Sequence, residues 1–410
     1  MGLDPGAVEG LGTVRVVGTG LLGTSVALGL SAGGADVLLS DPSPTSLALA
    51  CDLGAGRPDP GGEHVDLVVV AAPPDVTAQV VAEELARHPR ATVTDVASVK
   101  AGIAHQLADL RADLTRYVGS HPMAGRERSG PVAARGDLFL DRPWVLCPGA
   151  GSDRNRADAV RHLAVALGAW PLTMTPGEHD EAVALVSHLP QVAASLVAAR
   201  LGRAPEPAVG LAGQGLRDVT RIAGSDPLLW AQILAANAGP VRRVLSEVRD
   251  DLDALLQALE ALAAENACCE SPAPGRPAAG PATGASSPAS SPRTPASNRR
   301  RAAHGARAAV AGLVADGNTG RERIPGKHGG TPRRYAVLTV VVPDEPGSLG
   351  RLFADIGRAG VNVEELALEH APGRAVGLVE LSVLPETRHG LETALADTGW
   401  RLAGSTGEPG

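Results

Sequence analysis

A glycine-rich turn between a strand and a helix constrains the fold of this chain more than any other feature. The segment reads VRVVGTGLLG, an aliphatic run followed by glycines in the GxGxxG spacing. In such a turn the first glycine permits the tight bend, the second lets a pyrophosphate approach the backbone, and the third allows close helix–strand packing. The N–H groups of the following helix then favour an anion. The residues expected to bind a nucleotide here are Gly18, Gly20, Leu21, Leu22 and Gly23.

The rest of residues 11–176 continues this pattern of alternating strands and helices. Short Val- and Leu-rich runs recur as VRVVG, ADVLLS, DLVVVAA, ATVTDV, TRYVGS and PWVLC, with helical patterns between them. Near-continuous aliphatic strands interleaved with helices are typical of a parallel sheet that is covered on both faces. The sequence therefore predicts an α/β domain with a Rossmann-type, doubly wound parallel sheet over residues 11–176.

An acidic residue bears on the choice of nucleotide. Asp41 ends the second predicted strand, 18 residues after Gly23. A carboxylate at this distance accepts hydrogen bonds from a ribose diol and repels a 2′-phosphate. No Arg or Lys follows within residues 42–46 to hold such a phosphate, which favours NAD over NADP. The alternative is that Asp41 only caps the next helix.

The period of the sequence becomes helical over residues 177–267, which we expect to form an all-helical domain for substrate binding and dimerisation. A seven-residue repeat runs along its last helix, with apolar residues spaced alternately by four and three: Val241, Leu245, Val248, Leu252, Leu255, Leu259 and Leu262. Such a repeat is typical of helices that pack lengthwise. The partner is another helix of the same bundle or a second subunit, and we favour a homodimer.

A change of composition follows. Between Ala263 and Ala309 there is no Val, Ile, Leu or Phe, and seven prolines fall within residues 271–297. Such a segment buries too little apolar surface to offset the entropy lost on ordering. The sequence therefore predicts a disordered linker over residues 268–333.

Residues 334–404 have the pattern of a small ferredoxin-like βαββαβ domain, a strand, turn, helix, hairpin, helix and short strand. Its first turn holds Asp344, Pro346 and Gly347, and Asn362 opens the second strand. With these residues the segment resembles an ACT domain. The resemblance implies an amino-acid effector, most simply tyrosine, that would bind near them. The alternative is a ferredoxin-like domain with no ligand.

Composition disfavours several other classes of function. The net charge of −8 and a total of eight aromatic residues argue against a nucleic-acid partner. No run of 18 apolar residues occurs and the N-terminus lacks a signal-peptide pattern, so we expect no membrane insertion. The four cysteines have no zinc-ligand spacing, and no metal is expected. We expect a cytoplasmic protein.

Three further motifs carry residues suited to chemistry on an acidic substrate: HPMAGRERSG with His121, VSHLP with His188, and RDVTRIAGSDP with Arg221. His121 follows a strand at the carboxyl edge of the sheet, where ligands of doubly wound folds bind. Histidine is the usual base near neutral pH, and a guanidinium can hold a carboxylate through two hydrogen bonds. Arg221 could instead pair with Asp218 on one helix, and His188 could be a satisfied interdomain residue.

The ordered set of these motifs resembles the prephenate/arogenate dehydrogenase family over residues 14–266. The resemblance implies that His121 takes the proton of the substrate's ring hydroxyl and that Ser98, in DVASVK, helps to orient it. It further implies that His188 and Arg221 bind substrate, Arg221 through a carboxylate, and that Glu127 gates the site. Gln191 stands where some members of the family carry histidine, which bears on substrate choice.

The reaction that the resemblance implies is an NAD-dependent oxidative decarboxylation. Prephenate would give 4-hydroxyphenylpyruvate, whereas arogenate would give tyrosine directly. Two other functions stay open. A dehydrogenase of the β-hydroxyacid type usually relies on a lysine in its helical domain, but residues 177–267 contain none. A non-enzymatic amino-acid sensor would not need Ser98, His121, His188 and Arg221 together.

Overall fold

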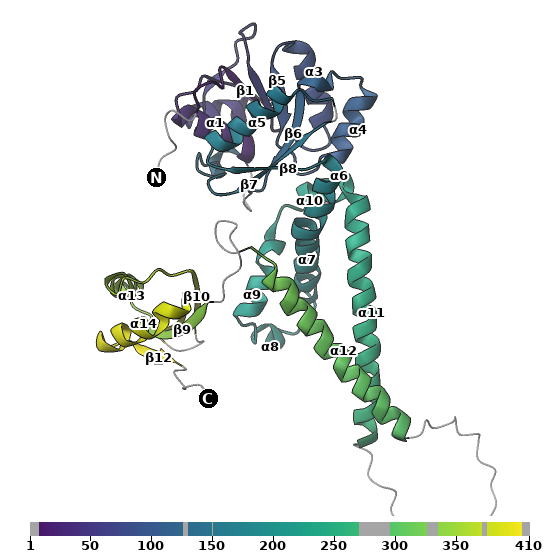
Figure 1. The fold of residues 1–410 in the computed structure, drawn as a ribbon, viewed down its shortest axis with the longest axis vertical. Helices are drawn as coiled ribbons and strands as arrows, with labels where there is room; N and C mark the ends of the chain where they lie inside the picture. The colour runs from purple at the N-terminus through teal and green to yellow at the C-terminus, as the bar shows by residue number, and fades with distance from the viewer. Residues whose placement is uncertain are drawn as a thin grey trace, which may run out of the picture. The chain divides into compact units, whose positions relative to one another are not determined.

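The computed structural model describes residues 8–125, 130–149, 151–269, 296–325, 335–370 and 375–403. The chain divides into two compact units, residues 1–250 and residues 251–410. The first contains an α/β domain and most of a helical domain, and the second contains a small α/β domain (Figure 1). The long helix α11 (Ala238–Cys269) begins in the first unit and ends in the second.

An eight-stranded sheet forms the centre of the α/β domain, in the order β3-β2-β1-β4-β5-β6-β7-β8. The strands are β1 (Val14–Val17), β2 (Val37–Ser40), β3 (Arg57–Pro58), β4 (Leu67–Val70), β5 (Thr92–Asp95), β6 (Tyr117–Pro122), β7 (Pro143–Pro148) and β8 (Trp170–Thr173). The strand order changes direction beside β1, as in a doubly wound sheet. The predicted Rossmann-type fold is confirmed.

The sheet departs from the prediction at its far edge, because it is not parallel throughout. β7 pairs antiparallel with β6, and β8 then runs parallel to β7. A parallel return needs a crossover, usually a helix. Between β6 and β7 the described residues instead contain a short 3₁₀ turn, η2 (Pro131–Ala133).

Helices cover both faces of this sheet (Figure 1). They are α1 (Leu21–Ala32), α2 (Pro44–Asp52), α3 (Thr77–Arg87), α4 (Ala101–Asp109) and α5 (Arg154–Ala166), with a 3₁₀ turn η1 (Leu114–Arg116). Successive residues of a strand face opposite sides. Along β4, Leu67 and Val69 therefore join one hydrophobic cluster, whereas Val68 and Val70 join the other.

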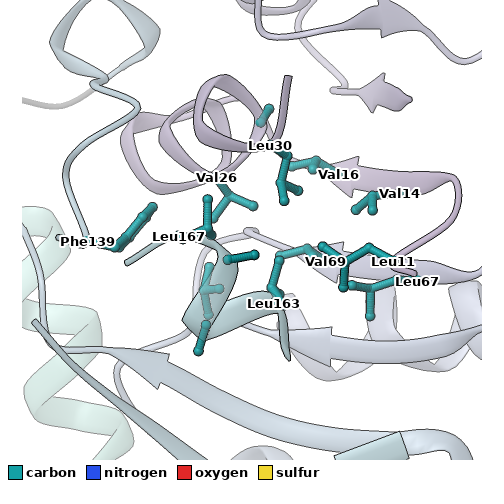
Figure 2. Close-up of a cluster of buried hydrophobic side chains, with 14 of the residues drawn as sticks. Leu11, Val14, Val16, Val26, Leu30, Leu67, Val69, Phe139, Leu163 and Leu167 are labelled. Carbon is teal, nitrogen blue, oxygen red and sulfur yellow. The ribbon is translucent and has the colours of Figure 1, made fainter. Parts of the chain in front are cut away.

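The first of these clusters fills the space between the sheet and the helices α1 and α5. Figure 2 shows side chains from β1, α1, β4 and the end of α5 converging there, among them Val14, Val16, Val26, Leu30, Val69, Leu163 and Leu167. All seven side chains are fully or nearly fully buried. This close packing fixes the position of the turn between β1 and α1.

The helical domain begins at α6 (Pro176–Val183), continues without a break through the π-helical turn η3 (Ala184–His188) into α7 (Leu189–Leu201), and ends with α11. Between them lie α8 (Glu206–Val209), α9 (Gln214–Thr220), the 3₁₀ turn η4 (Arg221–Gly224) and α10 (Pro227–Ala236). Thr175 and Glu178 form a capping box that starts α6. The helical prediction for this part of the chain agrees with these elements.

The stretch Pro176–Leu201 is the one helix among the described residues that is long and apolar enough to cross a membrane, with a mean hydropathy of 1.6. The core helix of a soluble protein can have the same length and apolar composition. Several of its apolar side chains, such as Leu185 and Leu196, are exposed in the single chain.

The prediction of a disordered linker over residues 268–333 is wrong for its central part. Ala296–Glu322 form a helix, α12, in which Ala306 is buried and Arg307 pairs with Glu265 of α11. The prediction rested on the prolines and on the absence of Val, Ile, Leu and Phe. The last of those prolines, Pro295, precedes the helix. Alanine and arginine, which dominate its first half, are strong helix formers. Residues 270–295 and 326–334 lie outside the described part of the chain.

The C-terminal domain has the predicted βαββαβ order. Its elements are β9 (Ala336–Pro343), α13 (Ser348–Arg358), β10 (Glu365–His370), β11 (Val376–Val383), α14 (Pro385–Asp397) and β12 (Arg401–Ala403). The strands form an antiparallel sheet in the order β10-β11-β9-β12. Leu352, Ile356, Leu391 and Leu395 of the two helices join one core with alternate residues of β9 and β11.

Candidate active site

The glycine turn between β1 and α1 has the geometry of a nucleotide cradle. Gly18 has a φ of +98°, and a Cβ placed there would lie 2.4 Å from the carbonyl oxygen of Ala71. A Cβ on Gly23 would lie 1.9 Å from the carbonyl oxygen of Gly18. A Cβ on Gly20 would meet no protein atom within 4 Å. The first and third glycines are thus required by packing, whereas the second leaves open space at the start of α1, suited to a phosphate.

Asp41 lies beside this turn. Its carboxylate accepts hydrogen bonds from the backbone N–H of Thr19 at 2.6 Å and from the Thr19 hydroxyl at 2.9 Å. It also accepts one from the N–H of Ser43, at 2.8 Å. The N-cap of α2 is Ser43, whose hydroxyl accepts from the N–H of Ser46. The alternative in which Asp41 caps that helix is therefore wrong, and the partly exposed carboxylate is tied to the glycine turn.

His121 lies near the end of β6, at the carboxyl edge of the parallel strands. Its Nδ1 is 2.9 Å from Nε2 of His179, a residue of α6, and the two rings meet edge to face. Nδ1 of His179 is in turn 2.8 Å from Oδ1 of Asp180. His179 is fully buried, whereas His121 is partly exposed. These three side chains form a chain of hydrogen bonds from α6 to the sheet.

Asp180 joins this chain to α4. Its Oδ1 accepts from the backbone N–H of Lys100, and its Oδ2 accepts from that of Ala101, both at 2.8 Å. These N–H groups belong to the start of α4, where orphan donors and the helix dipole favour a carboxylate. Asp180 therefore fixes α6 against the α/β domain at the point where His179 meets His121.

The surroundings of His121 disfavour its charged form. Desolvation lowers the pKa of His121 well below the usual 6.5, and the neighbouring basic side chains of His179, Lys100 and His188 lower it further. A histidine with a lowered pKa is neutral near pH 7 and can accept a proton.

A buried ionic network lies under the same edge of the sheet. Lys100 forms an ion pair with Asp95, and both side chains are buried. The Tyr117 hydroxyl donates to Oδ2 of Asp95 at 2.7 Å, and burial beside this carboxylate raises the pKa of Tyr117 well above 10.0. Ser98 lies between Asp95 and Lys100 in the chain, but within the described residues it makes no hydrogen bond with His121.

His188 closes the π-helical turn η3, directly before Leu189 and Pro190. Proline cannot donate to the preceding turn, and single π-turns inside α-helices are frequent at functional sites. The His188 ring is buried, stands edge-on against Trp230 at a centroid distance of 5.9 Å, and accepts at Nδ1 from the Asn237 amide at 3.2 Å. Burial lowers the pKa of His188.

The remaining predicted substrate residues differ in their placement. Arg221 is exposed at the start of η4, which packs against α7. Gln191 is buried and its amide bonds to the hydroxyls of Ser195 and Ser225. Glu127 lies outside the described residues. His121 is hydrogen-bonded to His179, and His188 is hydrogen-bonded to Asn237.

The predicted effector residues lie in the second unit. Gly347 has a φ of +87° and precedes α13, and the N–H of Asp344 donates to the Ala375 carbonyl. The Asn362 amide donates to Glu364 at 2.8 Å. Pro346 occupies the turn between Asp344 and Gly347.

Sequence reasoning missed His179, Asp180, Lys100 and Asn237. One feature of the sequence could have indicated His179 and Asp180. This adjacent pair, in GEHDEAV, directly follows the capping box that begins α6. Nothing in the sequence indicated that these residues of the helical domain would meet a strand end some 58 residues earlier.

Two family profiles of known proteins match the α/β part and the helical part of this chain. The profile described as "Prephenate dehydrogenase, nucleotide-binding domain" matches residues 26–170, and "Prephenate dehydrogenase, dimerization domain" matches residues 175–268. The chain is 35% identical over 390 residues to a protein of Streptomyces niveus named "Probable prephenate dehydrogenase NovF", covering 95% of this chain and 98% of that protein.

Two further relatives match a smaller share of the chain. Prephenate dehydrogenase of Bacillus subtilis (strain 168) is 30% identical over 267 residues, which cover 62% of this chain and 72% of that protein. The crystal structure of prephenate dehydrogenase from A. aeolicus in complex with hydroxyphenyl propionate and NAD+ superposes with a TM-score of 0.56 at 28% identity. It covers 62% of this chain and 93% of that chain.

Proposed function

This chain belongs to the prephenate dehydrogenase family, and we propose that His121 is the general base of its reaction. The protein is an NAD-dependent oxidoreductase that converts prephenate to 4-hydroxyphenylpyruvate by oxidative decarboxylation. The observation that carries the role of His121 is its position at the carboxyl edge of the sheet with a pKa well below the usual 6.5. A base of this kind contributes roughly 10²–10⁴-fold to the rate.

The chemistry needs one proton acceptor and one hydride acceptor at the same carbinol. NAD, when bound, accepts the hydride from the ring carbon. His121 takes the hydroxyl proton through Nε2, since its Nδ1 is occupied by His179. Loss of the ring carboxylate as carbon dioxide then leaves an aromatic ring, which makes the reaction effectively irreversible.

The cofactor residues follow from the fit of the glycine turn. We assign the pyrophosphate to the space beside Gly20, at the start of α1 with Leu21 and Leu22. The tight approach of Gly18 and Gly23 to their neighbours supports this assignment. Asp41, tied to the turn through Thr19, is placed to accept hydrogen bonds from the adenosine ribose.

Different observations support the proposed substrate residues. His188 is in the same helix as His179, and its Nδ1 accepts from Asn237, which leaves Nε2–H as a donor. Arg221 offers an exposed guanidinium for a carboxylate. We keep Ser98 in a supporting role and Glu127 as a gating residue, both from the family resemblance alone.

The regulatory and oligomeric assignments are also proposals. The helical domain matches a dimerization domain, which supports a homodimer. The βαββαβ order of the C-terminal domain supports an ACT-like sensor in which Asp344, Pro346, Gly347 and Asn362 would bind tyrosine. A cytoplasmic location accords with relatives that are biosynthetic enzymes. The arogenate alternative is not favoured over prephenate.

The proposed function is tested by following the absorbance of the NADH that the reaction forms. Purified full-length protein with NAD would receive prephenate and arogenate in parallel, with and without tyrosine. We expect turnover of prephenate, and a loss of roughly 10²–10⁴-fold in kcat for His121→Asn with little change in NAD affinity. The exposed His105→Asn is the matched control and should behave as the wild type.

Each arm of the test has a contrary outcome. Turnover of arogenate alone would reverse the choice of substrate. Full activity of His121→Asn would remove that residue from the chemistry. Tyrosine inhibition that survives deletion of residues 326–410 would show that the C-terminal domain is not the sensor.

A further inference from the structure

A buried histidine–aspartate pair stands behind the proposed base. His179 has no exposed surface, and its two ring nitrogens are both engaged, Nε2 with His121 at 2.9 Å and Nδ1 with Asp180 at 2.8 Å. Asp180 is nearly as deeply buried and belongs to the same helix, α6. None of the motifs that predicted the site contains either residue.

The hydrogen bonds of Asp180 determine where the proton of His179 lies. A carboxylate can only accept hydrogen bonds, and this one already accepts from the N–H groups of Lys100 and Ala101. Nδ1 of His179 therefore carries a proton and donates it to Asp180. The neutral ring then has a lone pair at Nε2, directed at Nδ1 of His121.

We propose that His179, held by Asp180, is a positioning residue that keeps the proton of His121 on Nδ1 and leaves the lone pair of Nε2 for the substrate hydroxyl. A neutral imidazole has one donor and one acceptor nitrogen, so fixing one nitrogen fixes the other. The inference rests on the proposed role of His121 as the base.

The step is balanced within the proposed reaction. The substrate O–H bond breaks and its proton joins Nε2 of His121, while the O–H electron pair forms the carbonyl as the hydride leaves the carbon for NAD. The resulting imidazolium keeps its Nδ1–H bond to His179. Because His179 is backed by the Asp180 carboxylate, the hydrogen-bond chain stabilises the new positive charge on His121.

The other charged groups near His121 cannot supply this function. Lys100 has donors only and is paired with Asp95, while His188 is bonded at Nδ1 to Asn237. Both side chains lower the pKa of His121, which disfavours an imidazolium. Within the part of the chain that the structure describes, His179 is the residue in hydrogen-bond contact with the ring.

The tautomer of His121 is the direct test, and it requires no turnover. Full-length protein labelled with ¹⁵N-histidine would be studied by long-range ¹H–¹⁵N correlation near neutral pH, with His121→Asn and His179→Gln used to assign the two rings. We expect the proton of neutral His121 on Nδ1. A proton found on Nε2 of His121 in the wild type would overturn the proposal.

A pair of substitutions separates positioning from simple packing. His179→Gln retains an acceptor oxygen for the Nδ1–H of His121, whereas His179→Phe fills the same space without one. We expect His179→Phe to lower kcat roughly 10- to 100-fold with KM for prephenate within about threefold, and His179→Gln to recover most of the loss. Equal kcat for the two variants would overturn the proposal, provided that both unfold at similar temperatures.

The matched control is another largely buried histidine on the far side of the domain. His88 follows α3 at the amino edge of the sheet, beside Glu84, and His88→Phe should leave kcat and KM unchanged.

The proposed base and the proposed positioning role fail in different ways. Full activity of His121→Asn would refute the base, whereas an inactive His121→Asn with no difference between the two His179 variants would refute only the positioning role.

Discussion

The acid limb of the pH–rate profile is determined at a single residue, His121. Desolvation and the neighbouring basic side chains hold the pKa of His121 well below 6.5, and the base must be unprotonated to act. We therefore expect kcat/KM for prephenate to stay level on acidification through pH 6.5 and to fall only below it. Steady-state rates between pH 5 and 9 measure this. A midpoint at or above 6.5 would contradict the proposed environment.

Cofactor choice is also a property of one residue. Asp41→Asn removes the charge that strengthens a hydrogen bond to the ribose and that repels a 2′-phosphate. We expect the ratio of kcat/KM for NAD to that for NADP to fall roughly tenfold or more. Asp36→Asn, an exposed carboxylate paired with Arg57, is the control and should leave the ratio unchanged. An unaltered ratio in Asp41→Asn would place the ribose elsewhere.

The turn between β1 and α1 allows a prediction at the scale of an element. Gly20 has a φ of −72°, which any residue adopts, and open space around its Cα. Gly20→Ala should therefore change the free energy of unfolding by less than about 1 kcal/mol, yet weaken NAD binding at least roughly tenfold by filling the space for the pyrophosphate. Calorimetric titration and thermal unfolding measure the two effects.

The neighbouring Gly18 should respond in the opposite way. Its φ of +98° and the contact with the Ala71 carbonyl leave no room for a Cβ. We expect Gly18→Ala to destabilise the domain by roughly 2 kcal/mol or more. If Gly18→Ala were as stable as Gly20→Ala, the described geometry of the turn would be wrong.

At the scale of the whole molecule, the seven-residue repeat of α11 tests the proposed dimer. Leu252 and Leu259 belong to this repeat and are about half exposed in the single chain. We expect Leu252→Glu combined with Leu259→Glu to shift the protein from dimer to monomer in sedimentation velocity, because charge would be buried at the interface. Arg249→Glu, on an exposed position of the same helix, should leave the mass unchanged. A dimer that survives the double substitution would place the interface elsewhere.

The sequence by itself determined the elements whose cause is local. The turn from β1 to α1 follows from glycine spacing, the two-sided core follows from continuous aliphatic strands, and the βαββαβ order follows from period and turn residues. The same local reasoning failed at α12, because proline counting ignored the helix propensity of the alanine-rich segment.

Only the tertiary structure decided what surrounds the proposed base. His121 and His179 are 58 positions apart in the chain and lie on a strand and on a helix of different domains. Asp180, the neighbour of His179, accepts hydrogen bonds from the N–H groups at the start of α4, an interaction that no spacing or composition encodes. The antiparallel placement of β7 beside His121 is of the same kind. Desolvation and hydrogen bonding depend on three-dimensional neighbours, and so do the tautomer and the pKa of the base.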